Sequence, residues 1–175
     1  MHSDIRKPKL VLDTPWFKVA ATQDGNQTSP HYVIHSPDFA VIVALDQQGQ
    51  LLRVRQFRPA VNGMTLELPA GHIEPGEKPE AAARKELLEE TGHEADSFEL
   101  LAVMSPSAAR FTNRMWCFFA SDARLAPDYE LQREAGLEWI SYPGRLTQLL
   151  AEKEFFSAIS HAALCAAVLR GKIKP

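Results

Sequence analysis

Residues 71–92 read GHIEPGEKPEAAARKELLEETG, a glycine-containing segment that leads into a run of strong helix formers. Pro79 suits the first turn of a helix, because its ring fixes φ and its missing N–H would have no helical partner there. The alanines, leucines and glutamates that follow favour a helix, and Gly92 is a suitable C-terminal stop. We therefore predict a loop bracketed by Gly71 and Gly76, followed by a single helix that ends before Gly92.

The predicted helix places three glutamates on one face of one turn. At about 100° per residue, Glu89 falls about 60° to one side of Glu86, and Glu90 falls about 40° to the other. Such a face is often only solvated, but three crowded carboxylates repel one another unless a positive charge neutralises them. Mg²⁺ or Mn²⁺, which prefer oxygen ligands, would do so. The opposite face is expected to point towards the core and holds Leu87, Leu88 and Thr91.

The composition is that of one ordinary domain. The chain has 175 residues and a formal net charge of -3, which offers no general attraction to nucleic acid or to an anionic membrane. Its apolar runs, such as the seven residues of Phe39–Leu45, fall far short of the roughly 20 that span a bilayer. Cys117 and Cys165 stand apart in apolar surroundings and suggest free thiols in a reducing compartment. We expect a soluble, cytoplasmic protein.

The remaining sequence predicts a strand-rich α/β protein. Two closing helices are expected at Arg145–Ala151 and Phe156–Arg170, and a polar loop is expected at Ser121–Ala135. Mixed strands with one interior helix and C-terminal helices favour a sheet covered on both faces. The expected strands are Lys9–Asp13, Pro15–Ala20, His31–His35, Phe39–Leu45, Leu51–Phe57, Thr65–Leu68, Phe98–Met104, Arg114–Ala120 and Leu137–Ile140.

The helix and its loop resemble the signature box of the Nudix hydrolases. The box runs from Gly71 through five residues to Glu77, and after seven more residues it reads KELLEETG from position 85. Two positions depart from the family pattern: Lys85 replaces the usual Arg, and His93 replaces an apolar residue. A lysine can hold a neighbouring carboxylate only as a point charge, without the bidentate fork of arginine.

Segments outside the box look like the ADP-ribose pyrophosphatase branch of that family. Residues 54–59 (VRQFRP) and 66–71 (LELPAG) carry this resemblance. The Ser105–Asn113 loop, however, contains no acidic residue, unlike the corresponding loop of many ADP-ribose enzymes. This departure bears on the substrate and not on the type of reaction.

The resemblance implies an α/β/α Nudix sandwich with a mixed sheet. Residues 1–175 would form a single Nudix domain, with a core at 38–175 and an N-terminal strand extension at 1–37 through which a homodimer forms. The implied activity is Mg²⁺-dependent hydrolysis of the diphosphate linkage of a small nucleoside diphosphate derivative, with ADP-ribose giving AMP and ribose 5-phosphate. Two alternatives stay open: a pyrophosphatase for another nucleotide sugar such as GDP-mannose, and a Nudix-like module that senses a nucleotide without hydrolysing it.

The resemblance also implies which residues bind the metal and activate the water. Glu86 and Glu90 would be metal ligands, assisted by Glu89 and the Ala70 carbonyl. Glu77 would be a supporting ligand or a partner for Lys85. In the ADP-ribose branch the general base commonly comes from a late loop, which makes Glu134 the first choice and Glu130 the second, with Glu89 the rival from the box.

The candidates for substrate binding are three arginines and one tryptophan. Arg58 matches a family arginine that contacts the phosphates, and Arg55 lies on the same segment. Arg114 follows the Ser105–Asn113 loop and could also reach a phosphate. Trp16 stands where the branch supplies an aromatic ring that stacks on the base, although an aromatic residue near a strand start more often packs in a core.

Overall fold

The computed structural model describes residues 8–23, 28–127 and 137–174. Within these residues the helices are α1 (Pro79–Thr91), α2 (Leu146–Leu149) and α3 (Ala158–Leu169), with a 3₁₀ turn η1 at Pro59–Val61. The strands are β1 (Lys9–Asp13), β2 (Lys18–Thr22), β3 (His31–His35), β4 (Phe39–Asp46), β5 (Leu51–Arg58), β6 (Gly63–Glu67), β7 (Ala70–His72), β8 (His93–Glu94), β9 (Glu99–Met104), β10 (Met115–Leu125) and β11 (Glu138–Tyr142).

The larger sheet is mixed, as predicted. Its main path runs β11-β5-β4-β10-β8, while β6 pairs with β5, β7 with β4 and β9 with β10. β10 runs parallel to β4, whereas β7 and β9 pair antiparallel with the same two strands. This arrangement places β7, which leads into the glycine-containing loop, beside the most buried strand of the protein.

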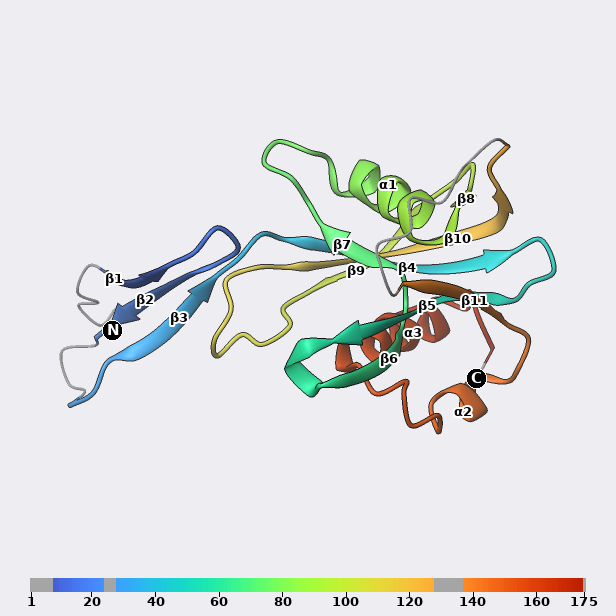
Figure 1. The fold of residues 1–175 in the computed structure, drawn as a ribbon. Helices are drawn as coiled ribbons and strands as arrows, with labels where there is room; N and C mark the ends of the chain where they lie inside the picture. Colours follow the sequence, from blue (N-terminus) through green and yellow to red (C-terminus); the bar gives the residue numbers. More distant parts are fainter. Residues whose placement is uncertain (1–7, 24–27, 128–136, 175) are drawn as a thin grey trace.

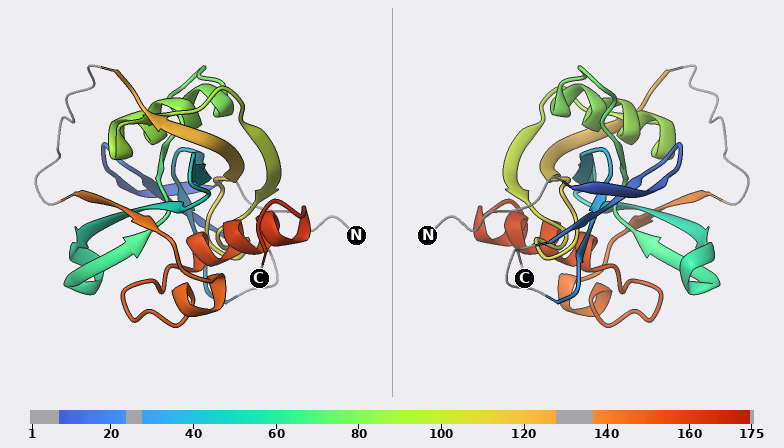
Figure 2. Two further views of the ribbon diagram at one scale, coloured as in Figure 1. Left: turned by 90° about the vertical axis from the view of Figure 1, so that its right-hand side faces the viewer. Right: turned by 90° about the vertical axis from the view of Figure 1, so that its left-hand side faces the viewer.

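Strand β4 is covered on both faces, which confirms the expected α/β/α sandwich. Val41 belongs to an apolar cluster that includes Leu164 of α3, and Ile42 belongs to a second cluster that includes Leu87 of α1. Successive side chains of a strand point to opposite faces, so α1 and α3 lie on opposite sides of the sheet (Figures 1 and 2). α1 begins at Pro79 and ends with Gly92 at φ 71°, as the sequence predicts.

A second sheet of β1, β2 and β3 projects from the larger one (Figure 1). Every residue of β1 is exposed, so this sheet has no apolar core of its own in one chain. Its contact with the rest of the protein includes two backbone hydrogen bonds at Ile34. The Ile34 N–H donates to the Arg110 carbonyl (2.7 Å), and the Thr112 N–H donates to the Ile34 carbonyl (3.1 Å).

Several expected boundaries were wrong, and three of the differences have a clear physical reason. The second strand begins at Lys18 and not at Pro15, because the Thr14 hydroxyl accepts a hydrogen bond from the Phe17 N–H (2.9 Å) and closes a turn there. Gly71 lies in β7 and not in a loop, since residues 70–72 pair with β4. β10 runs to Leu125, into the expected polar loop Ser121–Ala135, because a register shift after Ala120 lets strand pairing resume.

No helix in the described part of the chain is both long enough and apolar enough to cross a membrane.

Candidate active site

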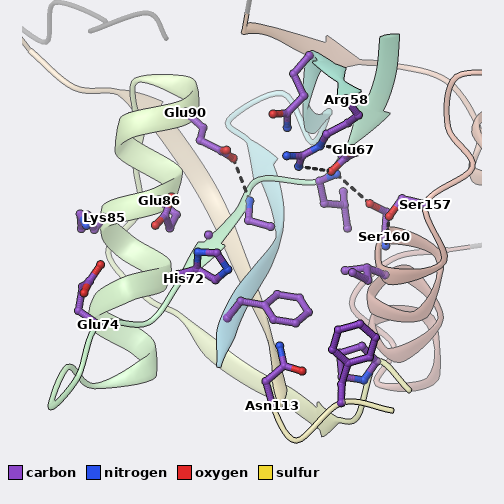
Figure 3. Close-up of a pocket in the computed structure, with 18 residues that line it drawn as sticks. Arg58, Glu67, His72, Glu74, Lys85, Glu86, Glu90, Asn113, Ser157 and Ser160 are labelled. Atoms are coloured by element: carbon purple, nitrogen blue, oxygen red, sulfur yellow. Dashed lines mark hydrogen bonds and ion pairs between the residues drawn. The ribbon is translucent and has the colours of Figure 1, made fainter. Parts of the chain in front are cut away.

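A cavity of about 690 Å³ opens between α1, the edge of β7 and the start of α3 (Figure 3). One wall is acidic and comes from α1. The next wall comes from β5 and β6, and the far wall comes from the loop before β10 and the first turn of α3. The polar lining residues include Arg58, Glu67, His72, Glu74, Lys85, Glu86, Glu90, Asn113, Ser157 and Ser160.

Glu90 is held against β7 by a backbone hydrogen bond. The Ala70 N–H donates to Glu90 Oε2 at 2.9 Å. Glu90 lies in the last turn of α1, and Leu87 and Thr91 beside it are fully buried, which fixes the orientation of this turn on the sheet. Leu88, which was also expected to face the core, is only half-buried. The packing of α1 therefore directs the Glu90 carboxylate towards the end of β7.

Glu86 lies against the backbone of Gly71. A Cβ atom at Gly71 would overlap the carboxylate of Glu86, so only glycine leaves room for that side chain. This close approach explains the glycine at the start of the motif. The backbone conformation of Gly71 does not require glycine, because the residue of this loop with a positive φ is Gly76 (φ 84°).

The two carboxylates form an electrostatically unfavourable pair. The pKa of Glu90 is raised to about 8, chiefly by burial and also by the nearby charge of Glu86, which together outweigh the lowering effect of the Ala70 N–H. A positive charge between the two carboxylates would relieve this cost. The donor set of Glu86, Glu90 and the Ala70 carbonyl consists of oxygen atoms only, which fits a hard divalent cation. Among the residues that the structure describes, however, no three acidic, histidine or cysteine side chains form a ready-made metal cluster.

Across the cavity from Glu90, Arg58 forms a bidentate ion pair with Glu67. The Arg58 Nε–H donates to Glu67 Oε1 (2.9 Å), and its Nη2–H donates to Oε2 (2.7 Å). The Thr65 hydroxyl donates to the same Oε1 at 2.6 Å. Because Arg58 stays partly exposed at the cavity wall, a guanidinium is present where an anionic ligand would enter.

The far wall carries polar groups that suit an uncharged part of a ligand. The Asn113 Nδ2–H donates to the Pro37 carbonyl (3.0 Å), while its buried Oδ1 has no hydrogen-bond partner among the described residues. Ser160 Oγ accepts from the Leu68 N–H (3.1 Å), and Ser157 accepts from the Ser160 N–H (3.5 Å) at the start of α3. These contacts fix the wall opposite the acidic helix (Figure 3).

Four of the residues proposed from the sequence meet at this cavity: Glu86, Glu90, Ala70 and Arg58. Glu89 does not line it. Its side chain is 53% exposed and lies 4.0 Å from Lys85 on the outer face of α1. Glu77 is also outside the lining, where its carboxylate accepts a hydrogen bond from the Glu74 N–H (2.9 Å) and closes the turn before α1.

The other proposed residues lie elsewhere. Arg55 forms a bidentate ion pair with Glu154 (2.8 and 3.0 Å), which raises the pKa of Arg55 further, and it does not line the cavity. Arg114 is exposed next to Asn113, outside the lining. Trp16 is 74% exposed in the turn between β1 and β2. Glu130 and Glu134 lie outside the described residues.

Sequence reasoning missed several lining residues. Glu67 was quoted only as part of a motif, although its position two residues after Thr65 places both side chains on one face of a strand. Asn113, Ser157 and Ser160 are not among the site residues predicted from the sequence, although all three line the cavity. His72, which follows Gly71 in the motif, also lines the cavity. His93, one of the two departures from the box pattern, is buried with its ring edge-on to Trp139 (4.8 Å between ring centroids), so it replaces an apolar residue in packing.

Comparison with known proteins agrees with this geometry. A model of the NUDIX domain matches residues 35–158. The chain is 33% identical over 83 residues to the methanol dehydrogenase activator of Bacillus methanolicus (47% of this chain, 45% of that protein). It is 36% identical over 71 residues to the ADP-ribose pyrophosphatase of Bacillus subtilis (41% and 38%). It is also 35% identical over 144 residues to the GDP-mannose pyrophosphatase of Yersinia pestis (73% and 70%).

The fold is also that of a solved structure. The crystal structure of an ADP compounds hydrolase superposes with a TM-score of 0.80 at 21% identity and covers 99% of this chain and 98% of that one. The alignments to the first two relatives cover less than half of those proteins, at 45% and 38%. The NUDIX match, in contrast, extends from the end of β3 to the start of α3 and includes the whole acidic wall of the cavity. The chain belongs to the NUDIX domain family.

Proposed function

We propose that the protein hydrolyses the diphosphate linkage of a nucleoside diphosphate sugar, with ADP-ribose as the first candidate substrate. The observation that carries this proposal is the placement of Glu86 and Glu90 on one wall of a cavity whose neighbouring wall presents Arg58. Two acidic groups and a guanidinium around one opening suit a substrate whose reacting part is a diphosphate with its divalent cation.

NUDIX hydrolases generally use divalent metal ions, and we propose Mg²⁺ here, with Mn²⁺ as an alternative. Glu86, Glu90 and the Ala70 carbonyl would hold it, while Glu89 and Glu77, the other expected ligands, are weaker candidates because neither lines the cavity. When bound, the cation would neutralise the charge of the diphosphate and make attack by water easier. The protein would otherwise contribute mainly positioning, since phosphoryl transfer asks for little else.

Arg58 would bind the phosphate oxygens, because a guanidinium fork matches their geometry. The reaction adds one water across the P–O–P linkage: ADP-ribose and water give AMP and ribose 5-phosphate. A carboxylate must accept a proton from the attacking water, and we assign this role to Glu134, with Glu130 and Glu89 as rivals. Arg114 is a weaker candidate for substrate contact, since it does not line the cavity in one chain. Arg55 was also expected to bind the substrate, but Glu154 holds it outside the cavity, and we do not propose a substrate contact for it.

We also propose that the protein is a homodimer, formed through the sheet of β1, β2 and β3. In one chain this sheet exposes large apolar side chains that water would not favour: Leu10 51%, Val11 56%, Trp16 74% and Tyr32 47%. A second copy would cover them. It would also bring Trp16 close enough to a neighbouring cavity to stack on a nucleobase. Free Cys117 and Cys165 agree with a reducing, cytoplasmic location.

GDP-mannose is the second candidate substrate, because the relative with that name aligns over 73% of this chain. A sensing module without activity is the rival from another class. The cavity favours an enzyme, since Glu86 and Glu90 are both present and both face into it.

A substrate screen tests the proposal. ADP-ribose, GDP-mannose and other nucleoside diphosphate sugars would each be incubated with Mg²⁺ or Mn²⁺. A phosphatase would then release inorganic phosphate from the phosphomonoester products, and this phosphate would be measured. We expect at least one sugar nucleotide, with ADP-ribose first, to be cleaved to a nucleoside monophosphate and a sugar phosphate. Binding without cleavage of any of them, under both metals, would support the sensing module and contradict the proposed function.

A further inference from the structure

Glu67 lies at the end of β6, three residues before the Ala70 that contacts Glu90. Its two carboxylate oxygens receive three hydrogen bonds: two from Arg58 (2.9 and 2.7 Å) and one from the Thr65 hydroxyl (2.6 Å). The Glu67 side chain is 15% exposed, while the Arg58 side chain is 44% exposed. The carboxylate is therefore the fixed member of the pair, and the guanidinium is the member that faces the cavity.

Strand pairing explains why these side chains meet. Arg58 is opposite Gly63, and Gln56 is opposite Thr65, so all of them project from the same face of the β5–β6 ladder. Gly63 has no side chain to occupy the space across from Arg58. The arginine can therefore lie back along β6 and reach Glu67, which follows Thr65 at the two-residue period of the strand.

Three charged side chains, those of Arg58, Glu67 and Glu90, line this part of the cavity. Burial raises the pKa of Glu67, but the hydrogen bonds from Arg58 and Thr65 outweigh it, so the net pKa lies below its usual value and Glu67 is ionised. Arg58, Glu67 and Glu90 all line the cavity, so their charges interact across it. If Glu67 lost its charge, Glu90 would compete for the guanidinium of Arg58.

We propose that Glu67, oriented by Thr65, is a positioning residue that holds the Arg58 guanidinium towards the diphosphate of the substrate and away from Glu90. This inference rests on the proposed function, because it assigns to Arg58 a phosphate ligand. A merely structural ion pair at this partly exposed position would contribute little to stability and nothing specific to binding.

The protein offers a matched control pair whose arginine lies on the same strand as Arg58. Arg55 and Glu154 form an equivalent fork at 2.8 and 3.0 Å, with side-chain exposures of 34% and 40%, and neither residue lines the cavity. The variant Glu154→Gln therefore removes a comparable ion pair without touching the cavity. Thr65→Val removes only the third hydrogen bond, and Glu67→Asp keeps the charge on a shorter side chain.

A double-mutant cycle with Arg58→Ala and Glu67→Gln tests the inference through kcat/KM for the best sugar nucleotide of the screen. We expect Glu67→Gln alone to raise KM by roughly tenfold, as expected when a charge-assisted phosphate contact is misplaced. In the Arg58→Ala background the same change should cost less than about twofold, because Glu67 acts through Arg58. Glu67→Asp should recover part of the loss, Thr65→Val should show a smaller loss, and Glu154→Gln should leave KM unchanged. Independent, multiplying losses in the cycle would overturn the inference.

A second measurement does not depend on turnover. The Nε–H signal of Arg58 would be followed by ¹H–¹⁵N NMR in EDTA while ADP, which carries the diphosphate, is added. We expect a saturating shift in the wild type and in Glu154→Gln, and a lost or much weaker shift in Glu67→Gln. An unchanged Arg58 signal in the wild type, or the same shift in Glu67→Gln, would overturn the inference. A wild type that shows the shift but cleaves no sugar nucleotide would contradict the proposed function alone.

Discussion

The backbone N–H of Ala70 donates a 2.9 Å hydrogen bond to the carboxylate of Glu90. One residue further, the missing side chain of Gly71 leaves room for the carboxylate of Glu86. A short strand thus receives both carboxylates of the acidic helix, one through a hydrogen bond and the other through close contact. We infer that β7 positions these two carboxylates to bind a divalent cation beside the substrate diphosphate.

The variant Gly71→Ala should lose activity while keeping its fold. The added Cβ would overlap the flexible end of the Glu86 side chain, which can swing away without moving the backbone. We expect kcat to fall at least as far as in Glu86→Gln, and the melting temperature to change by no more than a few degrees. Steady-state kinetics and thermal unfolding check both statements. Near-normal kcat would show that the position of Glu86 against β7 does not matter.

The stability of the metal-free protein should depend on the ionisation of Glu90. Its folded-state pKa of about 8 lies above the value near 4.3 expected in the unfolded chain. Between these values the folded state keeps a proton that the unfolded state releases, so the free energy of unfolding falls as the pH rises. The contribution of this proton to the free energy of unfolding is fully lost above about pH 8.

Glu90→Gln removes that charge and should therefore be more stable than the wild type in EDTA at pH 9, by a few degrees in Tm, and similar to it at pH 5. Thermal unfolding at the two pH values gives the comparison, with Glu89→Gln on the exposed face as the control. Adding Mg²⁺ should raise the Tm of the wild type and not that of Glu90→Gln, because the cation binds only the folded site. A Glu90→Gln protein that is less stable than the wild type at pH 9 would contradict the charge argument.

Trp16→Ala should raise KM far more than it lowers kcat, if Trp16 stacks on the base from a second copy. Stacking is equal in the ground and transition states, so its loss weakens binding uniformly. Kinetics and sedimentation should be measured on the same preparation. Dissociation into monomers with no specific change in KM would assign Trp16 to the interface and not to the substrate.

The general base can be located with three variants. Glu134→Gln should lower kcat by two or more powers of ten, within the range of about 10²–10⁴ typical of general-base assistance. It should leave the midpoint of the Mg²⁺ titration nearly unchanged, because Glu134 is not assigned as a metal ligand. Glu130→Gln is the internal control and should cost much less. If only Glu89→Gln abolishes turnover with metal affinity intact, the base lies on α1 and the assignment to the late loop is wrong.

Much of the fold could be predicted because local signals were strong and consistent. Pro79 and Gly92 bound α1 as expected, and the seven-residue apolar run forms most of the doubly buried β4. The same helical periodicity placed Glu86 and Glu90 on one face, and both line the cavity. Glu89 was harder to place. It differs from Glu90 by a rotation of only about 100°, and whether that rotation points a carboxylate into a cavity or into solvent depends on how α1 packs.

The features that the sequence did not reveal depend on contacts between distant segments. β7 has only three residues and exists because residues 70–72 pair with β4. The Arg55–Glu154 pair joins positions 99 residues apart, so the sequence around Arg55 could not indicate it. The fork between Arg58 and Glu67 required the register of β5 and β6, which the two expected strands alone did not specify.

The dependence of kcat on Mg²⁺, measured with ADP-ribose for the wild type, Glu86→Gln and Glu90→Gln, tests the central claim most directly. The account predicts that the wild type is inactive in EDTA and saturates with Mg²⁺. Both variants should retain less than about a hundredth of its kcat, a loss of roughly 2.7 kcal/mol or more in transition-state stabilisation. Retention of more than about a tenth of wild-type kcat by either folded variant, a difference of only ~1.4 kcal/mol, would contradict the assignment of Glu86 and Glu90 as the metal ligands.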